Sequence, residues 1–206
     1  MVKLLKELND FTYDHEEVKK IQKEGGPLVV TGILQRADTV NQNGRIYPRS
    51  ILEPQIEAYN VLVKERRAVG ELDHADEPVV NLKNVSHVIT DIWMEPDGAV
   101  KGKVEILNTP MGNILESLIK ANIKVGISSR ALGSVSEQRE GDIVQDDLYF
   151  ICWDFVSEPS TPGAWMMKEA KEYSRKELKD IFSRQQRVSM AANETLAFHK
   201  KIRGDK

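Results

Sequence analysis

The sequence predicts an α+β domain in which antiparallel strands form the centre and helices flank them. Residues 85–94 and 99–107 have strand-like composition and enclose the turn Glu95-Pro-Asp-Gly98, where proline fixes φ and glycine permits a positive φ. Helical patterns precede and follow this hairpin. A chain of 206 residues with 40% apolar content can bury one sizeable core. We therefore expect one domain.

Composition divides the chain into three parts. Residues 1–26 are charged, contain helix-forming stretches and end in Gly25-Gly26, which predicts a helical leader or appendage. Residues 27–165 form the expected core. Residues 166–206 have a helical pattern and are locally basic, so we expect a solvated helical tail.

The first half of the core is predicted to hold one strand and one helix. β-branched residues over 27–36 predict the strand, which precedes the polar turn 41–44. Ser50 can cap a helix that runs to about Arg67, in which Pro54 is tolerated only within the first turn.

The second half of the core begins with a helix after the hairpin. Thr109 is a suitable N-cap and Pro110 suits the first helical position, so the helix should run to about Asn122. Apolar residues at positions 123, 125 and 127 then alternate with polar ones, which predicts a half-buried strand with Ser128 facing away from the core. A last long strand is predicted over 143–156.

Charge and composition limit the classes of function. A net charge of −3 gives no overall electrostatic reason to bind nucleic acid. The single cysteine, Cys152, lies between Ile151 and Trp153 and is predicted to be a buried thiol. The chain lacks an export signal and any run near the roughly 18 apolar residues of a membrane span, so we expect a soluble, cytosolic protein.

Three short segments hold the residue types of a hydrolase. They are residues 70–78 (GELDHADEP), 124–134 (KVGISSRALGS) and 153–162 (WDFVSEPSTP), which together supply a histidine, a serine and an acid. A serine hydroxyl becomes a nucleophile when an imidazole accepts its proton and a third group holds that imidazole. Spacing alone does not establish such a triad, because each residue also has an ordinary structural interpretation.

A metal site competes for the first of these segments. Asp73, His74, Asp76 and Glu77 are closely spaced ligands of the hard or borderline type. Zinc would normally need a second nitrogen or sulfur ligand, and no other histidine lies four residues from His74. We therefore expect no metal.

Taken in order, five motifs resemble one known family. GILQRADTVNQNGRIYP, GELDH, DIWMEPDGAVKGKVEIL, VGISSRALGS and CWDFVSEPSTPGAW, over roughly residues 28–166, are similar to the prohead core protein proteases of T-even-type tailed phages. The resemblance implies a mostly antiparallel β-barrel flanked by helices, as in herpesvirus assemblins. It also implies a serine endopeptidase that needs no cofactor.

The resemblance further implies partners, location and specificity. The substrates would be scaffold or core proteins and the major capsid protein, cleaved after glutamate in apolar-X-Glu sites during capsid maturation. The enzyme would act in the host cytoplasm, inside the assembling prohead, without nucleic acid or membrane; whether it forms a homo-oligomer stays open. A non-catalytic scaffold protein with the same fold is the main alternative.

The resemblance assigns catalytic roles by position. His74 of GELDH corresponds to the base and Ser128 of GISSR to the nucleophile. Ser129 should face the other side of the strand and form a local hydrogen bond. Asp154 is the favoured third member; Asp91 and His87 are alternatives, because assemblins use a second histidine.

Substrate-binding residues are predicted less directly. A guanidinium would suit a substrate glutamate, with Arg130 nearest to the nucleophile and Arg45 and Arg49 as further candidates. Backbone N–H groups of residues 130–133, ending at Gly133, are the expected oxyanion donors.

The chain itself contains matches to the expected cleavage site. Leu5-Lys6-Glu7 lies in the predicted leader, which suggests trimming by the enzyme itself. Ile114-Leu115-Glu116 lies in a predicted helix and should be protected, because a protease binds its substrate in an extended form.

Overall fold

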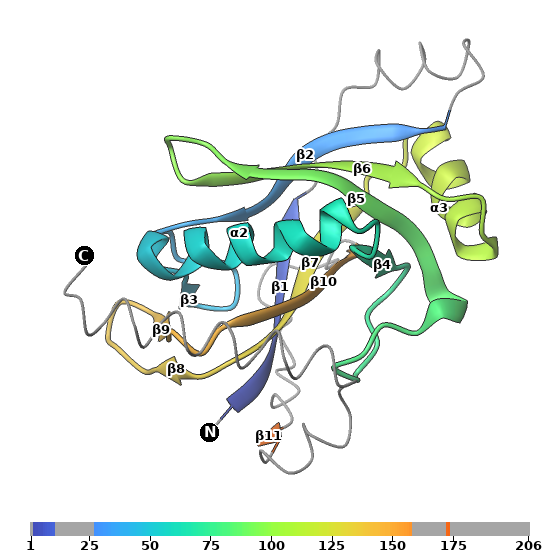
Figure 1. The fold of residues 1–206 in the computed structure, drawn as a ribbon. Helices are drawn as coiled ribbons and strands as arrows, with labels where there is room; N and C mark the ends of the chain where they lie inside the picture. The colour runs from blue at the N-terminus through green and yellow to red at the C-terminus, as the bar shows by residue number, and fades with distance from the viewer. Residues whose placement is uncertain (1, 11–26, 158–171, 174–206) are drawn as a thin grey trace.

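The computed structural model describes residues 2–10, 27–157 and 172–173, which form strands around one long helix (Figure 1). The elements in chain order are β1 (Val2–Asp10), β2 (Val29–Arg36), β3 (Arg45–Ile46), α2 (Arg49–Lys64), β4 (Val69–Glu71), the 3₁₀ turn η1 (Leu82–Asn84), β5 (Val85–Met94), β6 (Ala99–Ile106), α3 (Pro110–Lys120), β7 (Gly126–Gly133), β8 (Val135–Ser136), β9 (Asp142–Val144), β10 (Tyr149–Val156) and β11 (Glu172–Tyr173).

The strands form three sheets with the orders β10-β7-β1-β11, β2-β6-β5-β4 and β3-β9-β8. All neighbouring strands are antiparallel except β3 and β9. The expectation of a β-barrel is therefore wrong for the described residues. Among the described residues, the isolated β-bridge from Leu72 to Phe155 links the two four-stranded sheets, but no continuous ladder closes them into a barrel.

The N-terminal residues differ from the prediction of a helical leader. Residues 2–10 form strand β1, which lies between β7 and β11. Leu4 and Leu5 point to opposite faces of this sheet, and both are buried, because both faces are covered. Residues 11–26 lie outside the described residues, and so does the predicted tail except for β11, which pairs with Val2 and Lys3.

Local patterns predicted the hairpin and both helices. Strands β5 and β6 flank the predicted turn, in which Gly98 has a φ of 84°. Helix α3 begins at Pro110, and the Thr109 hydroxyl accepts the Gly112 N–H at 3.0 Å. Helix α2 begins one residue before Ser50, and the carboxylate of Asp38 accepts the Arg49 N–H at 2.9 Å in place of a serine cap.

The bounds of two further predicted strands differ from the observed ones. Strand β7 begins at Gly126 and continues to Gly133, beyond the predicted half-buried segment. The strand predicted over 143–156 is split into β9 and β10 by a turn in which the Leu148 N–H donates to the Gln145 carbonyl.

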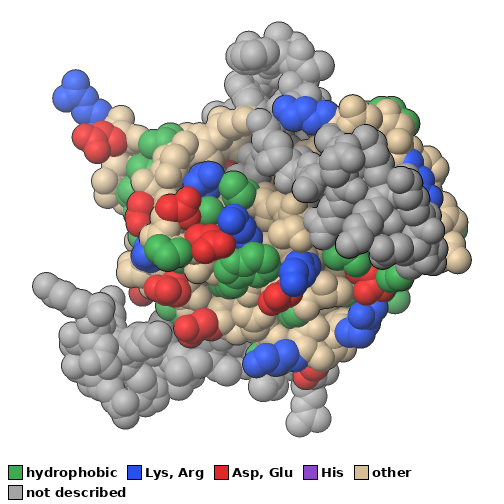
Figure 2. Space-filling view, turned by 90° about the horizontal axis from the view of Figure 1, so that it is seen from above, with side chains coloured by type: hydrophobic (Ala, Val, Ile, Leu, Met, Phe, Trp, Pro, Cys, Tyr) green, Lys and Arg blue, Asp and Glu red, His purple; other side chains and the backbone are tan. Residues whose placement is uncertain are grey.

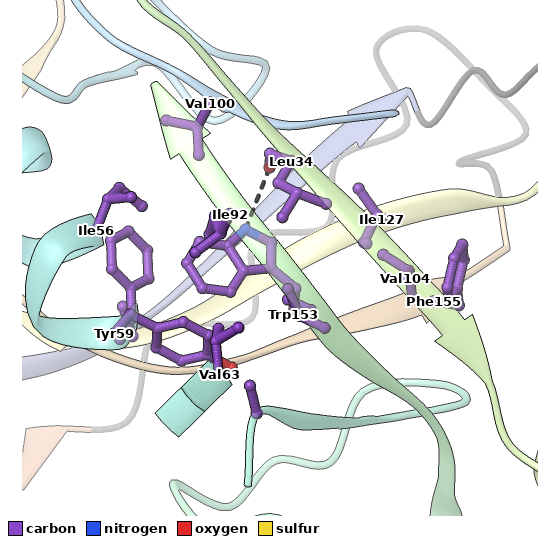
Figure 3. Close-up of a cluster of buried hydrophobic side chains, with 14 of the residues drawn as sticks. Leu34, Ile56, Tyr59, Val63, Ile92, Val100, Val104, Ile127, Trp153 and Phe155 are labelled. Carbon is purple, nitrogen blue, oxygen red and sulfur yellow. Dashed lines mark hydrogen bonds between the residues drawn. The ribbon is translucent and has the colours of Figure 1, made fainter. Parts of the chain in front are cut away.

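Trp153 of β10 lies at the centre of the hydrophobic core (Figure 3). Its indole N–H donates to the Leu34 carbonyl at 3.2 Å, and its ring meets Tyr59 of α2 edge to face at 4.8 Å. Phe150 stacks on the indole with ring centroids 4.5 Å apart. These contacts tie β10 to β2 and to α2, so the strand beside β7 is held rigidly.

The surface seen from above the view of Figure 1 carries interspersed acidic and basic side chains, with apolar side chains between them (Figure 2). This mixture agrees with the small net charge of −3. Within the described part of the chain, no helix is both long and apolar enough to span a membrane.

Candidate active site

Two neighbouring strands place a serine opposite an aspartate. Ser128 of β7 and Asp154 of β10 are directly paired in the antiparallel register, so their side chains lie on the same sheet face. Ile127 lies on the other face, within the core. Ser128 therefore faces away from that core, as predicted, but it is almost fully buried because the loop after β4 covers it.

That loop carries His74 and is fixed to β10 by its backbone. The Glu71 N–H donates to Asp154 Oδ1 at 2.8 Å, and the Asp73 N–H donates to the Phe155 carbonyl at 2.8 Å. Asp73 has a φ of 69°, a left-handed conformation that turns the chain toward Ser128. The loop is therefore held where its histidine can reach the strand pair.

Gly70 allows β4 to approach β10 closely. A Cβ at this position would collide with the Trp153 carbonyl oxygen and with the His87 ring. Any larger residue would push β4, and with it the His74 loop, away from β10.

His74 bridges the other two side chains. Its Nδ1 lies 2.9 Å from Asp154 Oδ2, and its Nε2 lies 2.5 Å from Ser128 Oγ. A carboxylate can only accept, so Nδ1 carries the proton and the lone pair of Nε2 faces the serine hydroxyl. This is the hydrogen-bond order of a serine–histidine–aspartate triad.

Asp154 is fully buried yet remains ionised. Burial alone would raise its pKa, but the hydrogen bond from His74 and the charge of Arg130 outweigh that effect, and the pKa lies below its ordinary value. Arg130 Nε lies 2.7 Å from Asp154 Oδ2. The carboxylate is thus available as a negative charge beside the imidazole.

Arg130 does not fit the predicted role of binding a substrate carboxylate. Its side chain is fully buried, and Nη2 pairs with Glu71 Oε1 at 2.7 Å. Nη1 donates to the Glu77 carbonyl at 2.9 Å, and Nε also lies 3.2 Å from Cys152 Sγ. The guanidinium contacts only groups of the protein itself among the described residues, and its ion pair with Asp154 fixes the position of that carboxylate.

Gly133 and the predicted oxyanion donors are also placed differently. Residues 130–133 belong to β7, whose backbone pairs with β1 on one side and β10 on the other. Five strand positions separate Gly133 from Ser128, about 16 Å along the chain. Gly133 instead packs beside Leu5 and Leu148.

The alternatives for the third member do not face His74. His87 is fully buried and bonds to Ser86 Oγ and to the Trp153 carbonyl, at 2.8 Å and 2.9 Å. Burial lowers its pKa to about 4, so it stays neutral. Asp91 is exposed on β5.

Ser129 faces the other side of the sheet, as predicted, but the predicted local hydrogen bond is absent. Its hydroxyl is buried and has no hydrogen-bond partner within the described part of the chain. Cys152 is fully buried, and burial raises the pKa of its thiol well above the ordinary value. It is therefore an inert thiol, as the sequence predicts.

The other predicted residues contact groups of the protein itself. Arg45 pairs with Glu7 at 2.7 Å, and Arg49 donates to the Glu95 carbonyl at 2.7 Å. In the loop considered for a metal, Asp76 pairs with Lys6 at 2.9 Å. Among the described residues, no group of three or more His, Cys, Asp or Glu side chains is arranged to hold a metal ion.

Sequence reasoning missed Glu71 and the clustering of side chains around Glu7. Glu71 belongs to the GELDH motif, but nothing in its neighbours indicates a buried ion pair with a residue 59 positions away. The repeated polar residues at positions 41, 43, 45 and 47 were a signal, since their regular spacing suggests one shared partner.

Comparisons with known proteins identify the family of the chain. The family model described as prohead core protein serine protease matches residues 9–175. The chain is 33% identical over 144 residues to the prohead core protein protease of Enterobacteria phage T4, covering 68% of each protein. It also resembles the solved structure of the bacteriophage T4 capsid assembly protease, with a TM-score of 0.65, 28% identity and coverage of 77% of this chain and 99% of that one. The chain belongs to the family of prohead core protein serine proteases.

Proposed function

We propose that this protein is a serine endopeptidase in which Ser128 is the nucleophile, His74 the general base and Asp154 the residue that orients the imidazole. The observation that carries the proposal is the continuous hydrogen-bond chain from Asp154 Oδ2 through His74 to Ser128 Oγ. A scaffold protein would need none of these three side chains in this arrangement.

The chemistry follows from the proton positions. As Ser128 Oγ bonds to a peptide carbonyl carbon, His74 Nε2 accepts the hydroxyl proton. The imidazolium then donates this proton to the departing amine, and the C–N bond breaks. Water attacks the acyl ester with the same nitrogen as base, which releases the acid and returns the proton to Ser128. Asp154 stabilises the transient imidazolium.

We infer the substrates from the names of the relatives of this chain. The T4 relative is named a prohead core protein protease, and the related structure is named a capsid assembly protease. We infer that this chain acts on scaffold or core proteins and on the major capsid protein, inside the assembling prohead in the host cytoplasm. Cleavage after glutamate in apolar-X-Glu sites is part of the proposal.

Digestion of a purified core-protein substrate tests the function. Ser128→Ala should lower the rate by on the order of 10⁴-fold or more, because the remaining site only stabilises the transition state. Ser129→Ala is the matched control, since its hydroxyl lies on the other sheet face. Near-normal digestion by a folded Ser128→Ala variant would contradict the assignment, and a chelator should leave the wild-type rate unchanged.

A further inference from the structure

A donor cluster surrounds the carboxylate of Glu7 in strand β1. Glu7 is fully buried, and each of its carboxylate oxygens accepts two hydrogen bonds. All four donors lie 2.7 Å away and come from one short segment: Asn41 and Asn43 on Oε2, Arg45 and Tyr47 on Oε1.

This donor cluster is chemically selective for glutamate. Every group that faces the two oxygens is a donor, so a glutamine would direct its own NH₂ group at donors. An aspartate would fall short by one methylene. Burial and then the charge of Glu7 raise the pKa of Tyr47 well above its ordinary value, which keeps its hydroxyl protonated as a donor.

The donor cluster lies beside the proposed catalytic serine. In the ladder between β1 and β7, Leu8 pairs with Ser128 and Glu7 pairs with Ser129. The peptide bond that follows Glu7 is therefore next to the strand that carries the nucleophile. On the face of Ser128, Lys6 Nζ reaches Asp76, two residues after His74, at 2.9 Å.

Strand β1 thus presents an extended apolar-X-Glu sequence to the active-site strand. Leu5 is fully buried in the core, Lys6 is half-buried against the His74 loop, and Glu7 lies in the donor cluster. An extended peptide that adds to β7 in the same register would meet the same three environments. Strand addition of this kind supplies affinity through the backbone and selectivity through alternate side chains.

We propose that the edge of β7 now covered by β1 is the docking edge for substrate, that the donor cluster recognises the substrate glutamate, and that β1 is a built-in competitor that must leave before a substrate enters. This inference rests on the proposed function and assigns it a specificity site and a form of self-inhibition. If Glu7 were only a structural ion pair, its partners would have no influence on which peptide is cleaved.

The first test is a change of specificity in the full-length chain. Wild-type protein should cleave an acetylated peptide with the sequence of residues 4–10 (LLKELND) on the order of 10²-fold faster than its Glu→Gln analogue, as kcat/KM. The double variant Glu7→Gln with Arg45→Met removes one negative and one positive charge together, so neither charge is left buried without the other. It should reduce that preference below about tenfold.

The matched control makes the same two changes at an ion pair between an exposed arginine and a half-buried glutamate. Arg66 and Glu105 are 3.0 Å apart and lie far in sequence from the donor cluster, so Glu105→Gln with Arg66→Met should leave the preference unchanged. A folded Glu7→Gln, Arg45→Met variant that keeps the full wild-type preference for glutamate would overturn the inference.

The second test does not depend on the folding of that variant. In the full-length Ser128→Ala protein, the peptide should displace β1 when present at ten times the KM measured with wild type. Amide hydrogen exchange over residues 3–10 should then accelerate at least tenfold, and the Gln analogue should have a much smaller effect. Unchanged exchange under these conditions would overturn the displacement of β1.

The two levels of proposal fail in different ways. If wild-type protein cleaves no peptide and does not react with a fluorophosphonate at Ser128, the serine-protease function itself is wrong. If it cleaves peptides through Ser128 without regard to glutamate or Arg45, only the docking edge and the donor cluster are wrong.

Discussion

Three of the contacts of Asp154 have different consequences when they are broken. Oδ2 holds His74 and meets Arg130 Nε, whereas Oδ1 accepts the Glu71 N–H. The contact with His74 sets the imidazole tautomer. The contact with Arg130 pairs a buried cation, and the contact with the Glu71 N–H holds the His74 loop. A substitution here should therefore affect both turnover and stability.

Asp154→Asn should lower kcat by about 10⁴-fold, because the amide favours the wrong tautomer of His74. It should also lower the melting temperature clearly, since Arg130 loses one of its two buried carboxylates. Steady-state kinetics and calorimetry on the same samples measure the two effects. Glu71→Gln is the control, because it removes the other carboxylate but keeps the His74 contact; an equal loss of kcat in both variants would contradict this division.

The position of Asp154 beside His74 agrees with the choice of Asp154 made from the sequence. The contacts of Arg130 could not be predicted in this way. GELDH, GISSR and strand β10, which contains Asp154, hold the residue types of the chemistry. Whether an arginine near a serine faces solvent depends on contacts with residues 59 and 24 positions away. Those contacts are a property of the packed sheets, which local sequence does not determine.

At the scale of single elements, α3 depends on its N-terminal cap. The Thr109 hydroxyl accepts the Gly112 N–H and donates to the Val85 carbonyl, which joins the helix to β5. Thr109→Ala should lower the free energy of unfolding by about 1–2 kcal/mol, since both bonds are lost. Urea denaturation measures this loss. Thr90→Ala on β5 is the control, because the Thr90 hydroxyl also donates to a backbone carbonyl, that of Lys103, but caps no helix. An unchanged midpoint for Thr109→Ala would contradict the capping role.

The elements also show which patterns predict structure. Helix α3 and the hairpin β5–β6 contain their own caps, turn residues and periodicity, so they were found from the sequence. Strand β1 was missed because both of its faces are covered, and Leu4 and Leu5 are consecutive rather than alternating. Its two lysines and one glutamate then suggest a charged helix.

At the scale of the molecule, His87 connects the two large sheets. It belongs to β5, its Nε2–H donates to the Trp153 carbonyl of β10, and its ring meets Phe155 edge to face. Burial lowers its pKa from 6.5 to about 4. The unfolded chain therefore binds this proton more readily than the folded chain does.

Stability should fall as the pH falls between 6.5 and about 4, and the His87 contribution should be complete above that window. Its size is about 3 kcal/mol at most, from the difference between the two pKa values. Urea midpoints of wild type and His87→Gln across this range isolate the effect. Parallel profiles for the two proteins would mean that His87 does not titrate in the folded state as described.

We propose that Ser128 is the nucleophile and that His74 and Asp154 activate it. The most direct measurement is the position of a fluorophosphonate adduct, mapped by mass spectrometry in wild type, Ser128→Ala and Ser129→Ala proteins. We expect one adduct, on Ser128, which persists in Ser129→Ala and disappears in Ser128→Ala together with proteolysis. An adduct on Ser129, or a Ser128→Ala protein that is still labelled and still digests its substrate, would contradict it.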